Sequence, residues 1–328
     1  MATRIYRRLE EVQFDPRSVI TVGTFDGLHC GHQAIIRTLK EQAQLRHAST
    51  TVITFDPHPQ MVVQRSDKPP VQILTTTEEK AALLREENID RIVVIPFTLE
   101  FSRTSSEAFV REILFQRIGM QAMVIGHDHG FGKNREGDFT TLQKLGKELG
   151  FTVHELPPFR MDGVTLSSTR VREALLQGEV EKAARYLGRP YCLRGTVTGG
   201  EGRGKLLGFP TANLLPNYER KLVPANGVYA VWVEGNLLAH GRTTGQSNSR
   251  YPAMMNIGYR PTFGKTARSL EVHVIDFSGD LYGAALAVHF VARLRNEQKF
   301  DSAQALVEQL WRDKETSYQV LKNERASF

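Results

Sequence analysis

The sequence predicts two domains: an α/β domain built on a parallel sheet, and a domain of antiparallel strands that forms a sandwich or small barrel and ends in a helix. The 328 residues exceed what one hydrophobic core usually organises. Short apolar runs alternate with helical segments as far as Leu156, whereas beyond Pro190 they follow one another with glycine turns between them. The predicted domains are 1–187 and 188–328.

Composition narrows the classes of partner. The formal charge of +6 would suit polyanionic ligands, but lysine and arginine are interspersed with acidic residues, so no nucleic-acid surface is predicted. The two cysteines, Cys30 and Cys192, supply neither a disulfide framework nor a cysteine-rich metal site. With no leader-like start and no apolar run of about 18 residues, we expect a soluble cytoplasmic protein without a membrane partner. The sequence does not predict an oligomeric state.

The elements of the first domain follow a strand–helix repeat. Thr77 is a candidate cap of the second helix, Ser105 or Ser106 of the third, and Thr140 or Thr141 of the fourth. After the strand that ends near Val22, further strands are expected at 51–55, 91–97, 122–126 and 152–156. This alternation predicts a parallel sheet covered on both faces, with functional residues just after the strands.

The stretch 20–32, ITVGTFDGLHCGH, holds the first candidate site. An apolar strand breaks into a glycine turn, and a helical pattern with apolar residues at four-residue spacing follows. Gly23 and Gly27 let backbone approach a ligand, and the helix start offers unpaired N–H groups. These features predict a phosphate site beside His29 and His32, although such a pair could also be part of a metal site or purely structural.

This stretch resembles the G-x-F-D-G-x-H-x-G-H turn of the nucleotidyltransferase module in bacterial bifunctional riboflavin kinase/FAD synthetases. The resemblance implies a Rossmann-like domain in which His29 and His32 contact the ATP triphosphate. It also places Gly23, Phe25, Asp26 and Gly31 at the ATP phosphates.

Two further segments of the first domain resemble flavin-side motifs of that family. TFDPHP, 54–59, includes His58, which is otherwise read as part of a strand-ending turn. GHDHGFGKNREGD, 126–138, resembles G-x-D-F-R-F-G-x-x-R-x-G-D and implies flavin contacts by Asp128, Phe131 and Arg135. It departs from the family at His129 and Gly130, where phenylalanine and arginine are usual, and this puts the flavin contacts of FAD synthesis in question.

The segment TLSSTRVREALLQG, 165–178, closes the first domain. On spacing alone it is a helix capped by Ser168 and ended by Gly178. It resembles the family's S-S-T-x-x-R motif, which implies nucleotide contacts by four side chains, with the arginine neutralising charge on the transferring phosphorus. These are Ser167, Ser168, Thr169 and Arg172.

A short helix, 179–187, precedes the second domain. A hairpin is expected over 227–241, and Glu271, His273 and Ile275 fall on one face of an alternating strand. The other strands are expected at 193–199, 269–277 and 285–295, and the closing helix at 302–320.

The loop GGEGRGKLLGFPTAN, 199–213, is not a Walker motif, because no Gly-Lys-Ser/Thr closes it. It resembles the flavokinase G-x-x-L-G-F-P-T-A-N, which implies a β-barrel kinase domain in which Thr211 and Asn213 hold Mg²⁺ and the ATP phosphates. Lys205 stands where arginine is common. The resemblance places the ATP phosphates beside Gly204, Lys205, Gly208, Pro210, Thr211 and Asn213.

Three more segments match flavokinases in order. NIGYRPTF, 256–263, and LRNEQKFDS, 294–302, imply flavin contacts by Asn256 and Arg295. LEVHVIDF, 270–277, places Glu271 at the position of the catalytic glutamate, whereas a glutamate in a strand is more often a surface residue.

The resemblance implies that the first module transfers AMP from ATP to FMN and that the second phosphorylates riboflavin, with Mg²⁺ as cofactor. The expected partners are ATP, riboflavin, FMN and FAD. In the first reaction His29, His32 and Arg172 stabilise charge, and in the second Glu271 is the general base. Two rivals are a flavin-binding or regulatory protein that kept both folds and lost one chemistry, and a nucleotidyltransferase with another phosphate acceptor.

Overall fold

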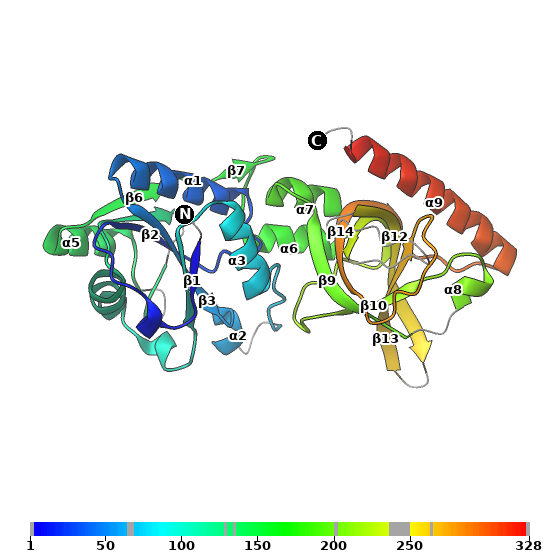
Figure 1. Cartoon of the computed structure of the whole chain (residues 1–328), viewed down its shortest axis with the longest axis horizontal. Coiled ribbons are helices and arrows are strands. Elements are labelled where there is room, and N and C mark those ends of the chain that lie inside the picture. Colours follow the sequence, from blue (N-terminus) through cyan, green and yellow to red (C-terminus); the bar gives the residue numbers. More distant parts are fainter. Residues whose placement is uncertain are drawn as a thin grey trace. The chain divides into compact units, whose positions relative to one another are not determined.

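The computed structural model describes residues 3–63, 69–127, 130–133, 136–199, 203–235, 250–262 and 265–325. The chain divides into two compact units, Met1–Ser168 and Thr169–Phe328 (Figure 1). The division falls directly after Ser168, the first residue of a helix, whereas the sequence analysis placed the boundary after residue 187. No helix in the described part of the chain is long and apolar enough to cross a membrane.

The first unit is built on a six-stranded sheet with the order β1-β4-β3-β2-β5-β6, and every described pairing in it is parallel. The predicted parallel sheet is confirmed; the three-residue strand β1 was not expected. Strand order reverses between β2 and β5, and in such sheets ligands bind outside the carboxyl ends of the strands at this point. The strands are β1 (Arg4–Tyr6), β2 (Ser18–Val22), β3 (Ser49–Asp56), β4 (Arg91–Pro96), β5 (Ala122–Gly126) and β6 (Thr152–Leu156).

Helices cover both faces of this sheet. Alternate strand residues form two apolar clusters, one containing Ile92 with Leu39 and Leu84 of α1 and α3, the other containing Val93 with Leu114 and Leu142 of η3 and α5. The helices are α1 (Cys30–Leu45), α2 (Pro59–Val62), α3 (Thr77–Glu86), α4 (Ser106–Ala108), the π-helix η3 (Phe109–Ile118) and α5 (Phe139–Leu149). Short 3-10 turns occur at η1 (Leu9–Glu11) and η2 (Phe101–Arg103), and β7 (Arg160–Met161) pairs with β8 (Val164–Thr165).

Helix starts lie close to the expected caps, with three corrections. Thr76, not Thr77, caps α3, because its hydroxyl accepts from Glu79 N–H while the Glu79 carboxylate accepts from Thr76 N–H. Asp138 rather than Thr140 or Thr141 caps α5, since its carboxylate accepts from the Thr141 backbone and hydroxyl. Ser168 is the first residue of α6 (Ser168–Leu176) instead of its cap. Ser105 caps α4 as predicted.

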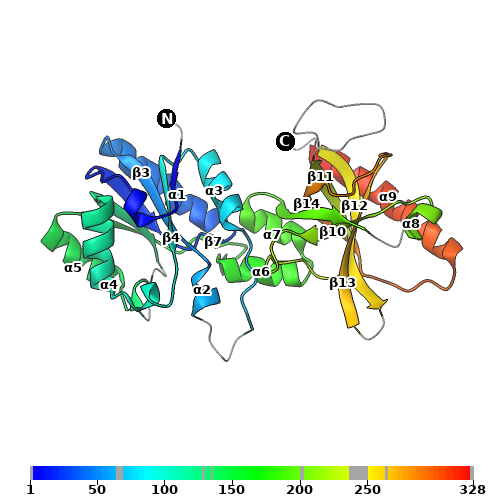
Figure 2. The ribbon, with the colours of Figure 1, turned by 60° about the horizontal axis from the view of Figure 1, so that its bottom comes forward.

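The second unit is a closed antiparallel barrel with the order β10-β13-β12-β11-β14-β9, so of the predicted sandwich or barrel the barrel is found (Figure 2). The first arm of the expected hairpin is β11; the rest of that hairpin lies outside the described residues. β12 was not expected as a strand, because its Gly258 and Pro261 are typical of turns. The strands are β9 (Tyr191–Thr198), β10 (Ala212–Pro216), β11 (Gly227–Gly235), β12 (Arg250–Thr262), β13 (Lys265–Val274) and β14 (Ala285–Arg295).

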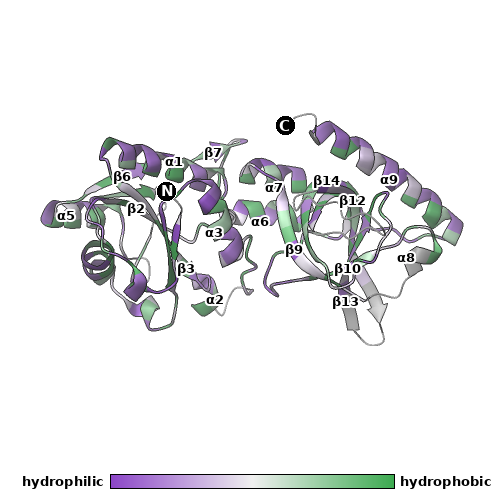
Figure 3. Cartoon of the chain, viewed as in Figure 1, coloured by the Kyte–Doolittle hydropathy of each residue, from purple (hydrophilic) through white to green (hydrophobic). Residues whose placement is uncertain are grey.

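Helices pack on the outside of the barrel. The predicted closing helix is α9 (Ala303–Arg325), whose Leu310 and Leu321 contact apolar residues of the strands. Polar and apolar residues alternate along α9 in Figure 3, as expected of a helix with one covered face. α7 (Val180–Leu187) packs on β14 and β9, and its Glu181 carboxylate accepts from the Arg293 N–H at 3.1 Å. These contacts explain why α7 belongs to the barrel unit. The remaining helix is α8 (Arg203–Leu206).

Candidate functional site

The turn between β2 and α1 holds the first candidate site. His29 caps α1, its Nδ1 accepting from the His32 N–H at 3.3 Å. Gly27 has φ +82°, a left-handed conformation that favours glycine, and its N–H donates to the Thr75 hydroxyl at 2.9 Å. A Cβ at Gly31 would lie 3.2 Å from the His29 ring. The glycines therefore keep this turn tight around the histidines.

The two histidines are stacked. Their ring centroids lie 3.6 Å apart with an interplanar angle of 16°, and the Phe25 ring meets His32 edge-on at 5.1 Å. Burial lowers the pKa of His32 well below its usual value, and the charges of His29 and Lys80 lower it further. His32 is therefore neutral at physiological pH, with its buried Nδ1 lacking a hydrogen-bond partner. A neutral imidazole offers a ligand one N–H donor but no charge.

The sequence left two other roles open for the histidine pair, a structural role and a metal site. His29 does have a structural role, because it caps α1. Among the described residues, no group of three or more histidine, cysteine, aspartate or glutamate side chains could hold a metal ion. The histidine turn does not stand out as a metal centre.

Asp26 is buried, with 1% of its surface exposed, and its carboxylate faces the protein. It accepts from the backbone N–H groups of Leu74 and Thr75, both at 2.9 Å, and from the Thr75 hydroxyl at 3.2 Å. The Asp26 carbonyl accepts from the Ser168 hydroxyl at 2.8 Å. Asp26 therefore joins the histidine turn to the segment before α3 and to the start of α6.

Lys80 of α3 is a site residue that the sequence analysis missed. It is 5% exposed, and its ammonium donates to the Thr54 hydroxyl at 2.9 Å; that hydroxyl donates in turn to the Thr24 carbonyl at 3.2 Å. Burial lowers the pKa of Lys80 to about 8, although Asp26 and Asp56 act in the opposite direction. The signal in the sequence was a lysine four residues before Leu84 on the apolar face of α3, since lysine is rarely buried without a function or a partner.

The flavin-side residues of the first unit are only partly described. Asp128, His129 and Arg135 lie outside the described residues. His58 caps α2, its Nδ1 accepting from the Gln60 N–H at 3.2 Å, which is the turn role considered from sequence. Phe131 is 7% exposed and lies 6.4 Å from Phe109 in a row of aromatic rings.

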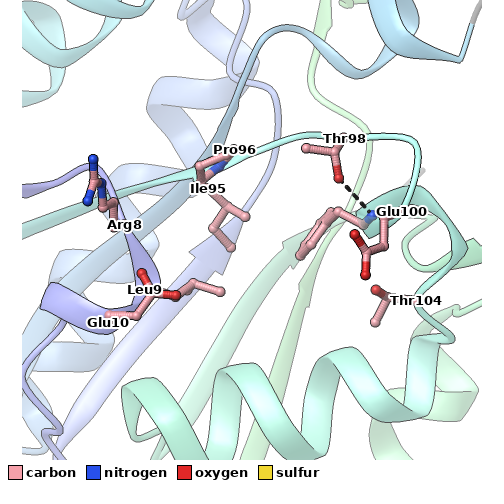
Figure 4. Close-up of a pocket in the computed structure, with 9 residues that line it drawn as sticks. Arg8, Leu9, Glu10, Ile95, Pro96, Thr98, Glu100 and Thr104 are labelled. Atoms are coloured by element: carbon pink, nitrogen blue, oxygen red, sulfur yellow. Dashed lines mark hydrogen bonds between the residues drawn. The ribbon is translucent and has the colours of Figure 1, made fainter.

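A pocket with a cavity volume of about 340 Å³ lies at the carboxyl end of β4 (Figure 4). Its lining includes Phe101, which lies 6.0 Å from Phe109 in the same aromatic row. The lining residues are Arg8, Leu9, Glu10, Ile95, Pro96, Thr98, Glu100, Phe101 and Thr104. None of the predicted site residues is among them.

In the second unit, three predicted residues meet on one face of the barrel. Asn213 of β10 and Asn256 of β12 are both register partners of Glu271 in β13, so the three side chains share one face. The Thr211 hydroxyl donates to Glu271 Oε2 at 3.4 Å. The hydroxyl of Thr211, the amides of Asn213 and Asn256 and the carboxylate of Glu271 therefore lie near one another on this face of the barrel.

His273 supports this arrangement from the same face. Burial is the main cause that lowers its pKa, so the ring is neutral and its Nδ1–H donates to the Pro210 carbonyl at 2.8 Å. Gly204 accepts from the Phe209 N–H at 2.8 Å, and a Cβ on Gly204 would collide with the Phe209 carbonyl. Gly208 adopts φ +79°. The start of the P-T-A-N segment is therefore held by His273 and by the turn at Gly204.

Arg295, the last residue of β14, forms an ion pair with Asp313 of α9. Its guanidinium donates to both carboxylate oxygens of Asp313 in α9, with Nη2 at 2.7 Å from Oδ2, and Asp313 is 4% exposed. Beyond it, the Glu297 carboxylate accepts from Asn226 at 3.1 Å and lies against Gly258 of β12. Neither Asp313 nor Glu297 was predicted: nothing in its own stretch marks Asp313, and of the motif 294–302 only Arg295 was named.

The remaining predicted residues are placed by their elements alone. Ser167 precedes α6, while Thr169 and Arg172 lie on α6 in the second unit. Gly23 follows β2, its N–H donating to the Ile53 carbonyl at 3.0 Å. Lys205 is in α8, and its side chain is outside the described part of the structure.

Comparison with known proteins gives matches over both units. The FAD synthetase family matches residues 11–170 and the riboflavin kinase family residues 187–321. A bifunctional riboflavin kinase/FMN adenylyltransferase of Escherichia coli K12 is 36% identical over 299 residues, which cover 91% of each chain. That of Pseudomonas fluorescens is 39% identical over 88% of each. A crystal structure described as a macrolide-efflux protein from Streptococcus pneumoniae is 30% identical, with TM-score 0.84 over 97% of this chain and 99% of its own.

Proposed function

Since this chain belongs to the family of bifunctional riboflavin kinase/FMN adenylyltransferases, we propose that the two groups of side chains described above carry its two reactions. The protein phosphorylates riboflavin to FMN and joins FMN to AMP from ATP, giving FAD and pyrophosphate. We assign the transfer of AMP to FMN to the histidine turn of the first unit. We assign the phosphorylation of riboflavin to the face of the second unit that carries Glu271.

In the kinase reaction, the 5′-hydroxyl oxygen of riboflavin attacks the γ-phosphorus of ATP, and the bond from that phosphorus to the ADP oxygen breaks. The hydroxyl must lose its proton, and we propose that Glu271 accepts it as general base. The observation that carries this assignment is the meeting of Glu271 with Thr211, Asn213 and Asn256 on one face of the barrel.

Enzymes of these families use ATP with a divalent metal, and we propose Mg²⁺ for this one. The residues fit, because Thr211 and Asn213 offer neutral oxygens beside the Glu271 carboxylate, and Mg²⁺ usually takes few protein ligands together with substrate phosphates. When bound, the ion neutralises charge on the phosphates. Lys205 and the glycines at 204 and 208 are proposed to hold the same triphosphate.

In the adenylyl transfer, an FMN phosphate oxygen attacks the α-phosphorus of ATP, and pyrophosphate leaves with the electron pair of the broken P–O bond. No proton has to be removed from the nucleophile, so the site has only to orient the triphosphate and stabilise charge. We propose that His29 and His32 do this as hydrogen-bonding groups, with Gly23, Phe25 and Gly31 shaping the turn and Ser167, Ser168, Thr169 and Arg172 completing the nucleotide contacts. Asp26 supports the turn from within.

On the flavin side, Asn256 and Arg295 in the second unit and His58, Asp128, Phe131 and Arg135 in the first remain predictions. Because its guanidinium is bonded to Asp313 of α9, Arg295 would support flavin binding by holding the segment that follows β14 in place. The proposed partners are small molecules: ATP, riboflavin, FMN and FAD. The absence of nucleic-acid partners and the cytoplasmic location remain predictions from the sequence.

The test is to incubate the full-length protein with riboflavin, ATP and Mg²⁺ and to separate the flavins by chromatography. FAD supports both assignments, and FMN without FAD points to the rival in which the first chemistry is lost. Unchanged riboflavin with active control enzyme would contradict the kinase assignment, and a second incubation with supplied FMN and ATP that yields no FAD would contradict the other. Repeating the reaction with Mg²⁺, Mn²⁺ or Ca²⁺ after chelation tests the metal.

A further inference from the structure

Lys80 is a buried cation whose surroundings do not balance it. Among the described residues it makes no ion pair, and its hydrogen bond goes to the neutral hydroxyl of Thr54. An ammonium has three N–H donors, so two remain available to another group. Removing a lysine from water is costly unless its charge is compensated, and the lowered pKa of Lys80 records that cost.

The position of Lys80 links it to the histidine turn. Its hydrogen bond reaches Thr54 at the end of β3, and Thr54 bonds to Thr24 within the turn itself. Burial is the main cause that lowers the pKa of His32, and the charge of Lys80 contributes, as expected of an ammonium near this imidazole. The charges of Asp26 and Asp56 favour the charged ammonium, but among the described residues neither carboxylate forms an ion pair with it, and that of Asp26 accepts from the backbone of Leu74 and Thr75. The two remaining N–H donors of Lys80 suit a ligand phosphate.

We propose that Lys80 is the electrostatic partner of the leaving pyrophosphate in adenylyl transfer, supplying the positive charge that the neutral His32 cannot. The inference rests on the proposed function of the first unit and deepens it. As the bond to the α-phosphorus breaks, negative charge grows on pyrophosphate, and a fixed ammonium in a water-poor site stabilises that charge more than it stabilises ATP.

A dependence on pH follows from the charge. Lys80 is charged below its pKa and neutral above it, so adenylyl transfer should weaken as the pH rises through about 8. The groups that face it are the carboxylates of Asp26 and Asp56 and the imidazole of His32, which is neutral in this range. This decrease at alkaline pH, the alkaline limb of the pH profile, should appear in kcat/KM for ATP, because that constant reports the ionisation of the free enzyme.

The experiment measures FAD formation from supplied FMN between pH 6.5 and 10 in full-length variants. Lys80→Met keeps length without charge and should lower kcat/KM by about 10²–10³-fold at pH 7 and remove the alkaline limb. Lys80→Arg should retain part of the activity and show no limb below pH 10. Lys40→Met is the matched control: Lys40 lies on α1 with 40% of its side chain exposed and pairs with Glu87, so both rate and limb should persist.

Thr54→Val separates charge from structure. It removes the hydrogen bond of Lys80 but not its charge, so the alkaline limb should remain. If Lys80→Met and Thr54→Val lose activity alike with the limb unchanged, Lys80 is only structural and the inference is wrong. A wild-type profile that is flat to pH 10 overturns it without any variant. If the wild-type protein makes no FAD at any pH, the proposed function of the first unit fails instead.

Discussion

Asn213 and Glu271 are register partners on the neighbouring strands β10 and β13, and Asn256 pairs with the same glutamate from the other side. Strand pairing therefore sets the carboxylate between two amides and within 3.4 Å of the Thr211 hydroxyl. The backbone hydrogen bonds of the barrel fix the positions of Asn213, Asn256 and Glu271 relative to one another, so this part of the proposed kinase site is held by strand pairing.

Glu271→Gln should reduce riboflavin phosphorylation by about 10²–10⁴-fold, because the amide keeps the shape but cannot accept the proton. Binding of ATP and riboflavin should change little, and supplied FMN should still become FAD. Rates are measured by separation of the flavins, and binding by calorimetry. Glu315→Gln, an exposed position on α9 that bonds to Gln319, is the control and should be active. A mutant that loses ATP binding at normal turnover would exclude Glu271 as the base.

His32→Ala should lower FAD synthesis by about 10²–10³-fold and leave FMN synthesis intact, since it removes one positioned donor from the first unit alone. Both products are followed in one assay. His47→Asn is the matched control, because His47 is exposed with φ +49°, a conformation that asparagine tolerates. Equal loss of both activities would mean that the two sites are coupled.

Asp26→Asn should destabilise the first unit by about 1–3 kcal/mol, because with Oδ1 kept toward Leu74 and Thr75 the amide N–H₂ replaces Oδ2, which accepts from the Leu74 N–H at 3.1 Å, and so turns a buried acceptor into a donor facing a donor. Trp232 and Trp311, the two tryptophans of the chain, both lie in the second unit, so tryptophan fluorescence should report an unchanged transition. Calorimetry should show that the unfolding transition of the first unit moves to a lower temperature. Asp138→Asn, where asparagine caps a helix as well as aspartate, should leave both transitions nearly in place.

The boundary of the kinase unit can be tested with two fragments. Residues 169–328 should fold and make FMN, because they keep α7 against β14 and β9. Residues 189–328, which the sequence boundary suggested, should unfold at lower temperature, since the strands lose the contacts of Val180, Ala183 and Leu187. Thermal melts followed by tryptophan fluorescence compare the two. Equal melting temperatures would favour the later boundary.

Much of this architecture could be predicted because its causes are local. Alternating apolar runs and helical periodicity define the parallel sheet, and glycine turns between short strands define the antiparallel domain. Caps were displaced by a few residues, since Thr76 and Thr77, or Asp138 and Thr140, offer similar oxygens and only backbone geometry selects one. β12 was missed because a proline and a glycine are tolerated where the neighbouring strands supply pairing.

The sequence by itself determined the candidates for chemistry: the histidine turn by its own pattern, and the P-T-A-N segment and Glu271 by their resemblance to flavokinase motifs. Only the tertiary structure decided how they are used. It turned the Asp26 carboxylate inward to Leu74, set Lys80 against Thr54, and joined Arg295 to Asp313. The physical reason is that burial, pKa and charge balance depend on residues far apart in the chain, which local patterns do not encode.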